Sequence, residues 1–164
     1  MFLYIPTSRL IVMSIVSLGL YQAYWVYRNW RYLKERDGLR IRPFWRGVFD
    51  IFFISSLFST IKNDAPTNQI QPATFSPGVL ATGWVILWIL GYVLGSVPDR
   101  AANLVGIIIS VPSFCFLLPV QNHINAVNEA SPIRPSYYGW SSGHIVCLGV
   151  GIIMWILILV ALTQ

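Results

Sequence analysis

Five stretches of apolar residues, separated by short polar or basic segments, divide the chain. A stretch of about 18 to 20 apolar residues is long enough to cross a bilayer as an α-helix. The pattern therefore predicts an all-α, polytopic membrane protein that forms one helical membrane domain over residues 1–164. The expected membrane segments are residues 9–27, 44–62, 78–97, 103–120 and 145–162.

Four of these segments are expected to be transmembrane helices, and residues 44–62 are the exception. That segment is rich in Phe but carries Arg46, Asp50 and several hydroxyl side chains. Charges are expensive inside the bilayer, so the segment is predicted either to span the membrane or to be re-entrant. Its path also decides on which side residues 63–77 and 121–143 lie.

The first segment is expected to continue beyond the membrane as one long helix from Arg9 to Asp37, with Gly38 as its C-cap. In the fourth segment, Pro112 and Pro119 predict kinks, because proline removes a backbone donor and clashes with the preceding turn. The polar stretch that follows predicts a short amphipathic helix at the interface.

Composition supports lipid as the solvent. Hydrophobic residues make up 55% of the chain and charged residues 10%, whereas a soluble domain usually has about 25% charged residues. The net charge is +5, and seven of the eleven basic residues lie between Arg28 and Arg46, directly after an apolar segment. This placement predicts a cytoplasmic basic loop and anionic lipid as partner, and argues against nucleic acid.

The residues after the first segment mix aromatic rings with cations. Trp and Tyr prefer the headgroup zone, and Lys and Arg beside them gain about 1 kcal/mol each from anionic lipid. The mixture is typical of membrane anchoring, or of a specific site for an anionic lipid or a partner membrane protein. The candidate residues are Arg28, Trp30, Arg31, Lys34, Arg36, Arg40, Arg42 and Trp45.

Two further groups of polar residues are candidates. Arg46 and Asp50 are four residues apart, the spacing of an ion pair on a helix; ion or proton passage is the alternative role. Asn122, Asn125 and Glu129 share one helical stripe with Asn128 beside it. This amide-rich face is expected to be wet, to pair with a neighbouring loop, or to bind a headgroup, a peptide or an ion.

Gly83, Gly91 and Gly95 share one face of the third segment and predict close helix packing, within the chain or in a homo-oligomer. An Ile-Arg-Pro run recurs at 41–43 and 133–135 in similar surroundings, and duplicated halves are common in transporters. Cys115 and Cys147 lie in apolar stretches and are expected to behave as small hydrophobes.

Catalytic chemistry is not expected. His123 and His144 match no standard metal spacing, and no cofactor-binding loop is present. Residues 141–144 match the Ser-Gly-His element of phosphatidic-acid-type phosphatases, but the downstream Arg and His of those enzymes have no counterpart. The sequence favours a non-enzymatic accessory or scaffold protein; the alternative is a small transporter or channel module that uses Asp50 and the kinked fourth segment.

Two blocks of the sequence, "YQAYWVYRNWRYLKERDG…IRPFWRGVF" and "LLPVQNHINAVNE", resemble small bacterial inner-membrane proteins grouped in domain-of-unknown-function families. The first block carries a Tyr-x-x-Tyr-Trp-x-Tyr element, a basic helix and a Pro-Phe-Trp-Arg element. The likeness covers about a third of the chain. It implies a multi-pass protein of the bacterial inner membrane and brings no established activity with it.

Overall fold

The computed structural model describes residues 2–131 and 138–163, which contain helices and no strand, so the all-α prediction is confirmed. In chain order the elements are α1 (Thr7–Val16), α2 (Leu20–Asp37), α3 (Pro43–Val48), α4 (Asp50–Lys62), α5 (Ala65–Ile70), α6 (Pro77–Gly95), α7 (Arg100–Ser110), the 3₁₀ helix η1 (Val111–Phe116), α8 (Leu118–Ala130) and α9 (Ser142–Thr163).

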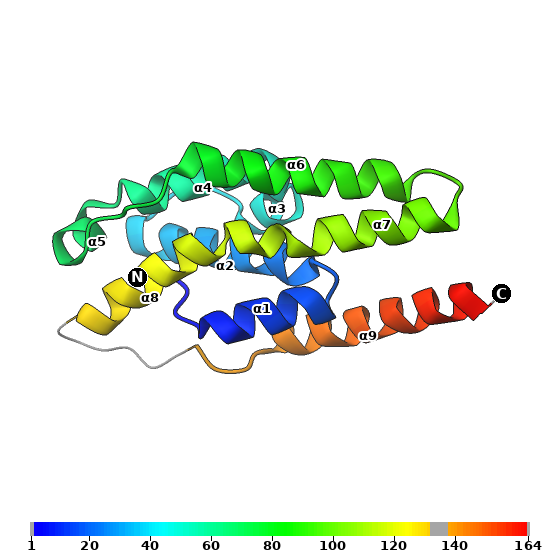
Figure 1. The fold of residues 1–164 in the computed structure, drawn as a ribbon. Helices are drawn as coiled ribbons and strands as arrows, with labels where there is room; N and C mark the ends of the chain where they lie inside the picture. The colour runs from blue at the N-terminus through cyan, green and yellow to red at the C-terminus, as the bar shows by residue number, and fades with distance from the viewer. Residues whose placement is uncertain (1, 132–137, 164) are drawn as a thin grey trace.

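Three helical segments in the described part of the chain are long and apolar enough to cross a membrane: Pro77–Gly95, Arg100–Ala130 and Ser142–Val160. The first two form an antiparallel hairpin, and α9 runs alongside in the direction of α6 (Figure 1). At most 22% of each apolar window is buried inside the protein. The apolar surface that remains exposed needs lipid as its solvent.

The first apolar segment is not the single helix that the sequence predicted. Leu18 and Gly19 have positive φ values of 49° and 91°, so the chain turns back between α1 and α2 and the two helices form a hairpin (Figure 1). The Ser17 hydroxyl accepts a hydrogen bond at 2.9 Å from the backbone N–H of Tyr21, in the first turn of α2. With 10 residues, α1 is only about 15 Å long.

Residues 44–62 also fail to form one spanning helix. The chain breaks at Phe49 between α3 and α4, which have 6 and 13 residues and cannot individually cross about 30 Å of hydrocarbon. The predicted count of four spans plus a fifth membrane helix is therefore replaced by three candidate spans. Gly38, by contrast, is the left-handed C-cap of α2, with φ 64°, as predicted.

The fourth segment is longer than predicted. Helical structure continues from α7 through η1 into α8, so the expected separate interfacial helix is the end of this segment. The 3₁₀ stretch begins one residue before Pro112, and Pro119 lies in the first turn of α8, where its missing N–H costs little.

The turn between α1 and α2 packs directly against α9, because a Cβ atom placed on Gly151 of α9 would overlap the carbonyl oxygen of Val16. In the α6–α7 hairpin, a Cβ atom placed on Gly106 would lie 2.7 Å from the carbonyl oxygen of Gly91. Glycine at these positions lets the backbones touch. The α5 end of the molecule and the α6–α7 turn lie at opposite ends of the bundle (Figure 1).

This arrangement predicts the sidedness of two exposed positions. In a Cys115→Ser, Cys147→Ala background, a membrane-impermeant maleimide added to intact cells is expected to label Val97→Cys in the α6–α7 turn. Gln69→Cys in α5 is expected to react only after permeabilisation, because it shares an end with the basic loop. Labelling of both variants from the same side would contradict the topology.

Candidate functional site

The basic residues predicted to bind lipid divide into paired and unpaired groups. Lys34, Arg40 and Arg42 are exposed and make no ion pair with any described residue. Arg31 donates to Glu35 at 2.7 Å, but both side chains are about half exposed, at 48% and 56%. Such a surface pair contributes little and remains open to competition from a lipid phosphate.

Arg36 has a structural position. Its guanidinium donates to Asp37 at 2.6 Å and to Asp64 at 2.5 Å, which joins the end of α2 to the start of α5. The Asp64 side chain is only 5% exposed, and its carboxylate also accepts from the Thr67 N–H at 3.3 Å. Hydrogen bonding to Asp37 raises the pKa of Arg36, and Arg36 in turn lowers the pKa of Asp37.

Two residues of the predicted surface are drawn into the protein. Trp30 is 2% exposed and lies beneath the Arg46 guanidinium, whose carbon is 4.1 Å from the ring centroid, so its predicted place at the headgroup surface is wrong. Arg28 lies 4.2 Å above the ring of Tyr138. Both arginines are held by cation–π contacts that a lipid would have to displace.

The predicted ion pair between Arg46 and Asp50 is not formed among the described residues. Arg46 faces Trp30 and Phe53, whereas Asp50 is 7% exposed at the first position of α4. Residues four apart meet only on a continuous helix, and the break at Phe49 separates the two side chains.

An exposed aromatic ledge follows the unpaired cations. It consists of Phe44, Trp45, Phe49 and Phe52, between 48% and 75% exposed. Gly47 allows α3 to lie directly on α2, because a Cβ there would be 2.6 Å from the Cβ of Tyr27. Beside this contact lies an apolar groove of about 310 Å³ lined by Ala23, Tyr24, Tyr27, Phe44, Gly47 and Val48.

The amide-rich stripe is divided by the fold. Asn125 and Asn128 are buried, whereas Asn122 and Glu129 are exposed. The Asn122 carboxamide oxygen accepts from the Thr7 hydroxyl at 2.9 Å, and the Glu129 carboxylate accepts from the Tyr4 hydroxyl at 3.5 Å. All four residues lie on α8, next to the chain segment that leads into α1.

Gln121, which sequence reasoning overlooked, is the centre of this contact. Its Oε1 accepts from the Trp25 indole at 2.6 Å, and its Nε2 donates to Asn125 at 2.7 Å and to the Leu3 carbonyl at 3.1 Å. Its position in the sequence could have identified it: Gln121 lies four residues after Leu117 and three before Ile124, both buried, and therefore on the same face of the helix.

A second polar network joins α2 to the start of α9. Tyr21 and His144 meet at 3.0 Å between the hydroxyl and Nε2, and Tyr24 contacts the Ser141 hydroxyl at 2.9 Å. The Ser141 backbone N–H donates to Nδ1 at 3.2 Å, so Nδ1 is the acceptor and the ring proton lies on Nε2. The described residues contain no cluster of three potential metal ligands around either histidine.

The three predicted packing glycines contact α7 and η1 of the same chain. Gly83 faces the ring of Phe116, and a Cβ on Gly91 would lie 2.5 Å from the Cβ of Ser110. The Gly95 backbone nitrogen is 3.0 Å from the position of a Cβ on Gly106. The α6–α7 hairpin is therefore held by the close backbone approach that small residues permit.

The fold and these surfaces define an all-helical protein with three helices able to cross a membrane and a basic, aromatic surface on α2 and α3. No protein-family model, curated protein or solved structure matches the chain significantly. The likeness to small bacterial membrane proteins stays a prediction.

Proposed function

We propose that this chain is a non-enzymatic multi-pass protein of the bacterial inner membrane that binds anionic lipid through its cytoplasmic basic and aromatic face. One observation carries the proposal. Three exposed cations without an ion pair among the described residues, Lys34, Arg40 and Arg42, directly precede an exposed aromatic ledge and an apolar groove.

The two parts of this surface suit the two parts of a phospholipid. Arg42 directly precedes α3, and Phe44, two residues later, lines the groove. A phosphate at Arg42 would place an acyl chain within reach of the groove between α2 and α3. The exposed ledge would lie in the surrounding lipid, where aromatic rings anchor a protein at the interface.

Ion pairing decides which cations are available. Arg36 is committed to Asp37 and Asp64, and Arg28 to the ring of Tyr138. Recruiting either one to a lipid would cost the contact that it already makes. Lys34, Arg40 and Arg42 carry no such cost, so they should supply most of the electrostatic attraction.

The triple variant Lys34→Gln, Arg40→Gln, Arg42→Gln tests the proposal. At about 1 kcal/mol per cation, its affinity for phosphatidylglycerol should fall about 100-fold at low salt. The measurement is binding of fluorescent phosphatidylglycerol to the protein in nanodiscs of zwitterionic lipid. Arg100→Gln, at the opposite end of the bundle, is the matched control and should bind like the parent.

Unchanged lipid binding by the folded triple variant would contradict the proposal. If the variant instead lost a membrane-protein partner in native-membrane crosslinking while keeping lipid binding, the surface would serve protein contact. We rank the alternative role as a transporter that uses Asp50 lower, because Asp50 is 7% exposed and does not line the groove between α2 and α3.

A further inference from the structure

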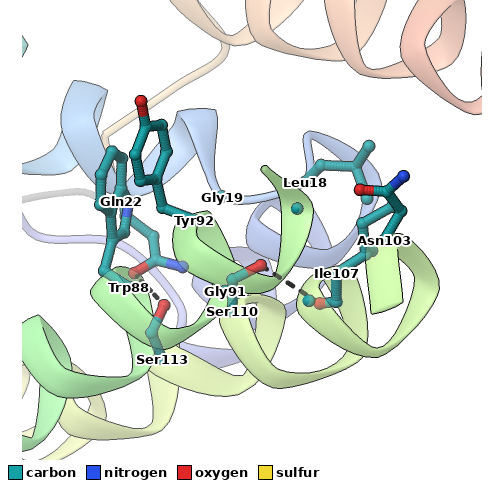
Figure 2. A pocket seen from close by; sticks show the side chains of 12 residues that line it. Leu18, Gly19, Gln22, Trp88, Gly91, Tyr92, Asn103, Ile107, Ser110 and Ser113 are labelled. Atoms are coloured by element: carbon teal, nitrogen blue, oxygen red, sulfur yellow. Dashed lines mark hydrogen bonds between the residues drawn. The ribbon is translucent and has the colours of Figure 1, made fainter. Parts of the chain in front are cut away.

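A cavity of about 200 Å³, lined by both polar and apolar groups, lies where the α1–α2 turn meets α6, α7 and η1 (Figure 2). It is separate from the lipid-binding face on α2 and α3. The lining side chains with polar or aromatic groups are Gln22, Trp88, Tyr92, Asn103, Ser110 and Ser113. A space of this size, bordered by polar side chains, accommodates a small molecule or several waters.

Gln22 presents an unused pair of donors to the cavity. The residue is 2% exposed, and its Oε1 accepts from the Trp84 indole at 2.6 Å and from the Ser113 hydroxyl at 3.0 Å. An indole N–H can only donate, so the atom facing it must be the oxygen. The side-chain NH₂ therefore points away from Trp84, and Figure 2 shows it turned toward the side on which Gly91 and Ser110 lie.

The side-chain NH₂ of Gln22 has no acceptor among the described residues, since the two hydrogen bonds of this side chain both use its oxygen. A polar donor that faces a cavity is satisfied by water or by a ligand that accepts hydrogen bonds. The first turn of α2, which starts at Leu20 beside the cavity, adds the positive end of a helix dipole. Both features favour a ligand that accepts hydrogen bonds.

The other lining groups define the charge and the entrance. No acidic, basic or histidine side chain is among the described residues that line the cavity, so an ion would find no counter-charge there. Asn103 lies near the start of α7 and Gly95 at the end of α6. The cavity thus extends from the buried Gln22 toward the α6–α7 turn, from which a water-soluble molecule would enter.

We propose that this cavity is a binding site for a small uncharged molecule whose carbonyl oxygen accepts a hydrogen bond from the side-chain NH₂ of Gln22. Asn103 and the Ser110 hydroxyl, which already donates to the Ile107 carbonyl at 3.2 Å, supply further polar contacts (Figure 2). The rings of Trp88 and Tyr92, stacked with centroids 6.2 Å apart, flank the ligand on the α6 side.

Protection of a cysteine placed in the cavity tests the site. In a Cys115→Ser, Cys147→Ala background, the rate at which methyl methanethiosulfonate modifies Ser110→Cys is measured with acetamide or with acetate. Saturating acetamide is expected to slow modification about tenfold, because an occupied cavity excludes the reagent. Acetate has the same size but a charge, and is expected to give no protection.

Two substitutions then locate the protection. Gln22→Leu removes the donor and is expected to abolish it. Because Gln22 also holds Trp84 and Ser113, Gly95→Leu provides a second test: a Cβ there has no neighbour within 4 Å, so the side chain fills free space at the cavity. Gly149→Leu on α9, equally free of neighbours, is the matched control and should keep full protection.

Absence of protection by acetamide in the folded parent would overturn the proposal, as would equal protection by acetate. Protection that survives both Gln22→Leu and Gly95→Leu would overturn it too. Lipid binding at the surface on α2 and α3, which shares no lining residue with the cavity, should be unchanged in Gly95→Leu, so the outcome is independent of the proposed function.

Discussion

Replacing Gly151 by leucine is expected to force the α1–α2 turn away from α9 and to lower the stability of the protein strongly. A Cβ at this position would overlap the Val16 carbonyl oxygen and lie 2.7 Å from the Cα of Ser17. The obstacle is backbone, which cannot rotate aside as a side chain can. Overpacking usually costs about 1–3 kcal/mol, and this substitution should reach the upper end of that range.

The measurement is thermal unfolding of the purified protein in detergent. A loss of about 3 kcal/mol corresponds to a fall in Tm of about 6–12 °C for a chain of this size. Gly149→Leu lies on the same helix, adds the same side chain and meets no neighbour within 4 Å. An equal fall in Tm for the two variants would show that the turn does not rest on α9.

Replacing Gln121 by leucine is expected to have an even larger effect. It removes the acceptor of the Trp25 indole and the donor to the Leu3 carbonyl, two buried groups that no water can reach in the described packing. Each buried group left without its partner costs about 1–3 kcal/mol, and the loss of the bond to Asn125 adds to this.

The N-terminal segment should therefore detach from α8 in this variant. Limited proteolysis followed by mass spectrometry is expected to show cleavage before Thr7 that the parent resists. Asn122→Leu changes the neighbouring, exposed residue, whose one described contact is with the Thr7 hydroxyl, and should remain resistant. Parent-like resistance of Gln121→Leu would mean that the segment does not depend on Gln121, and that apolar packing and its other hydrogen bonds, such as that of the Leu3 N–H to Asn29, hold it.

Both substitutions remove a contact of the kind that holds the helices of this protein together. Lipid tails are as apolar as leucine, so the hydrophobic effect gives little attraction between helices inside a membrane. The described contacts compensate in two ways. Gln22, Gln121 and His144 form buried hydrogen bonds between distant segments, and Gly91 and Gly106 let α6 and α7 approach closely.

Each candidate site contains polar groups that the rest of the fold leaves unpaired. Near α2 and α3, Arg36 is paired with Asp64 and Arg28 lies over the ring of Tyr138. Lys34, Arg40 and Arg42 have no ion pair among the described residues and remain available. In the cavity, the Gln22 side-chain oxygen accepts from Trp84 and Ser113, and its NH₂ has no acceptor among the described residues. In each case pairing elsewhere in the fold determines which group remains free for a ligand.

Apolar length and charge placement predicted the helical class, the clustering of cations after the first apolar segment and, among the four firm spans, the three that the structure keeps. The glycine at position 38 predicted the C-cap of the basic helix. These features depend on neighbours in sequence and on the choice between lipid and water as solvent. The reversal at Leu18 and Gly19 was within reach, because Ser17 and a glycine interrupt the apolar stretch.

The tertiary structure decided which polar groups are paired. Trp25 and Gln121 are 96 residues apart, and Gln22 and Ser113 are 91 apart. Helical spacing suggested the pair of Arg46 and Asp50 instead, and the break at Phe49 prevented it. Periodicity along one helix cannot report such contacts, since they depend on which distant segments the fold brings together.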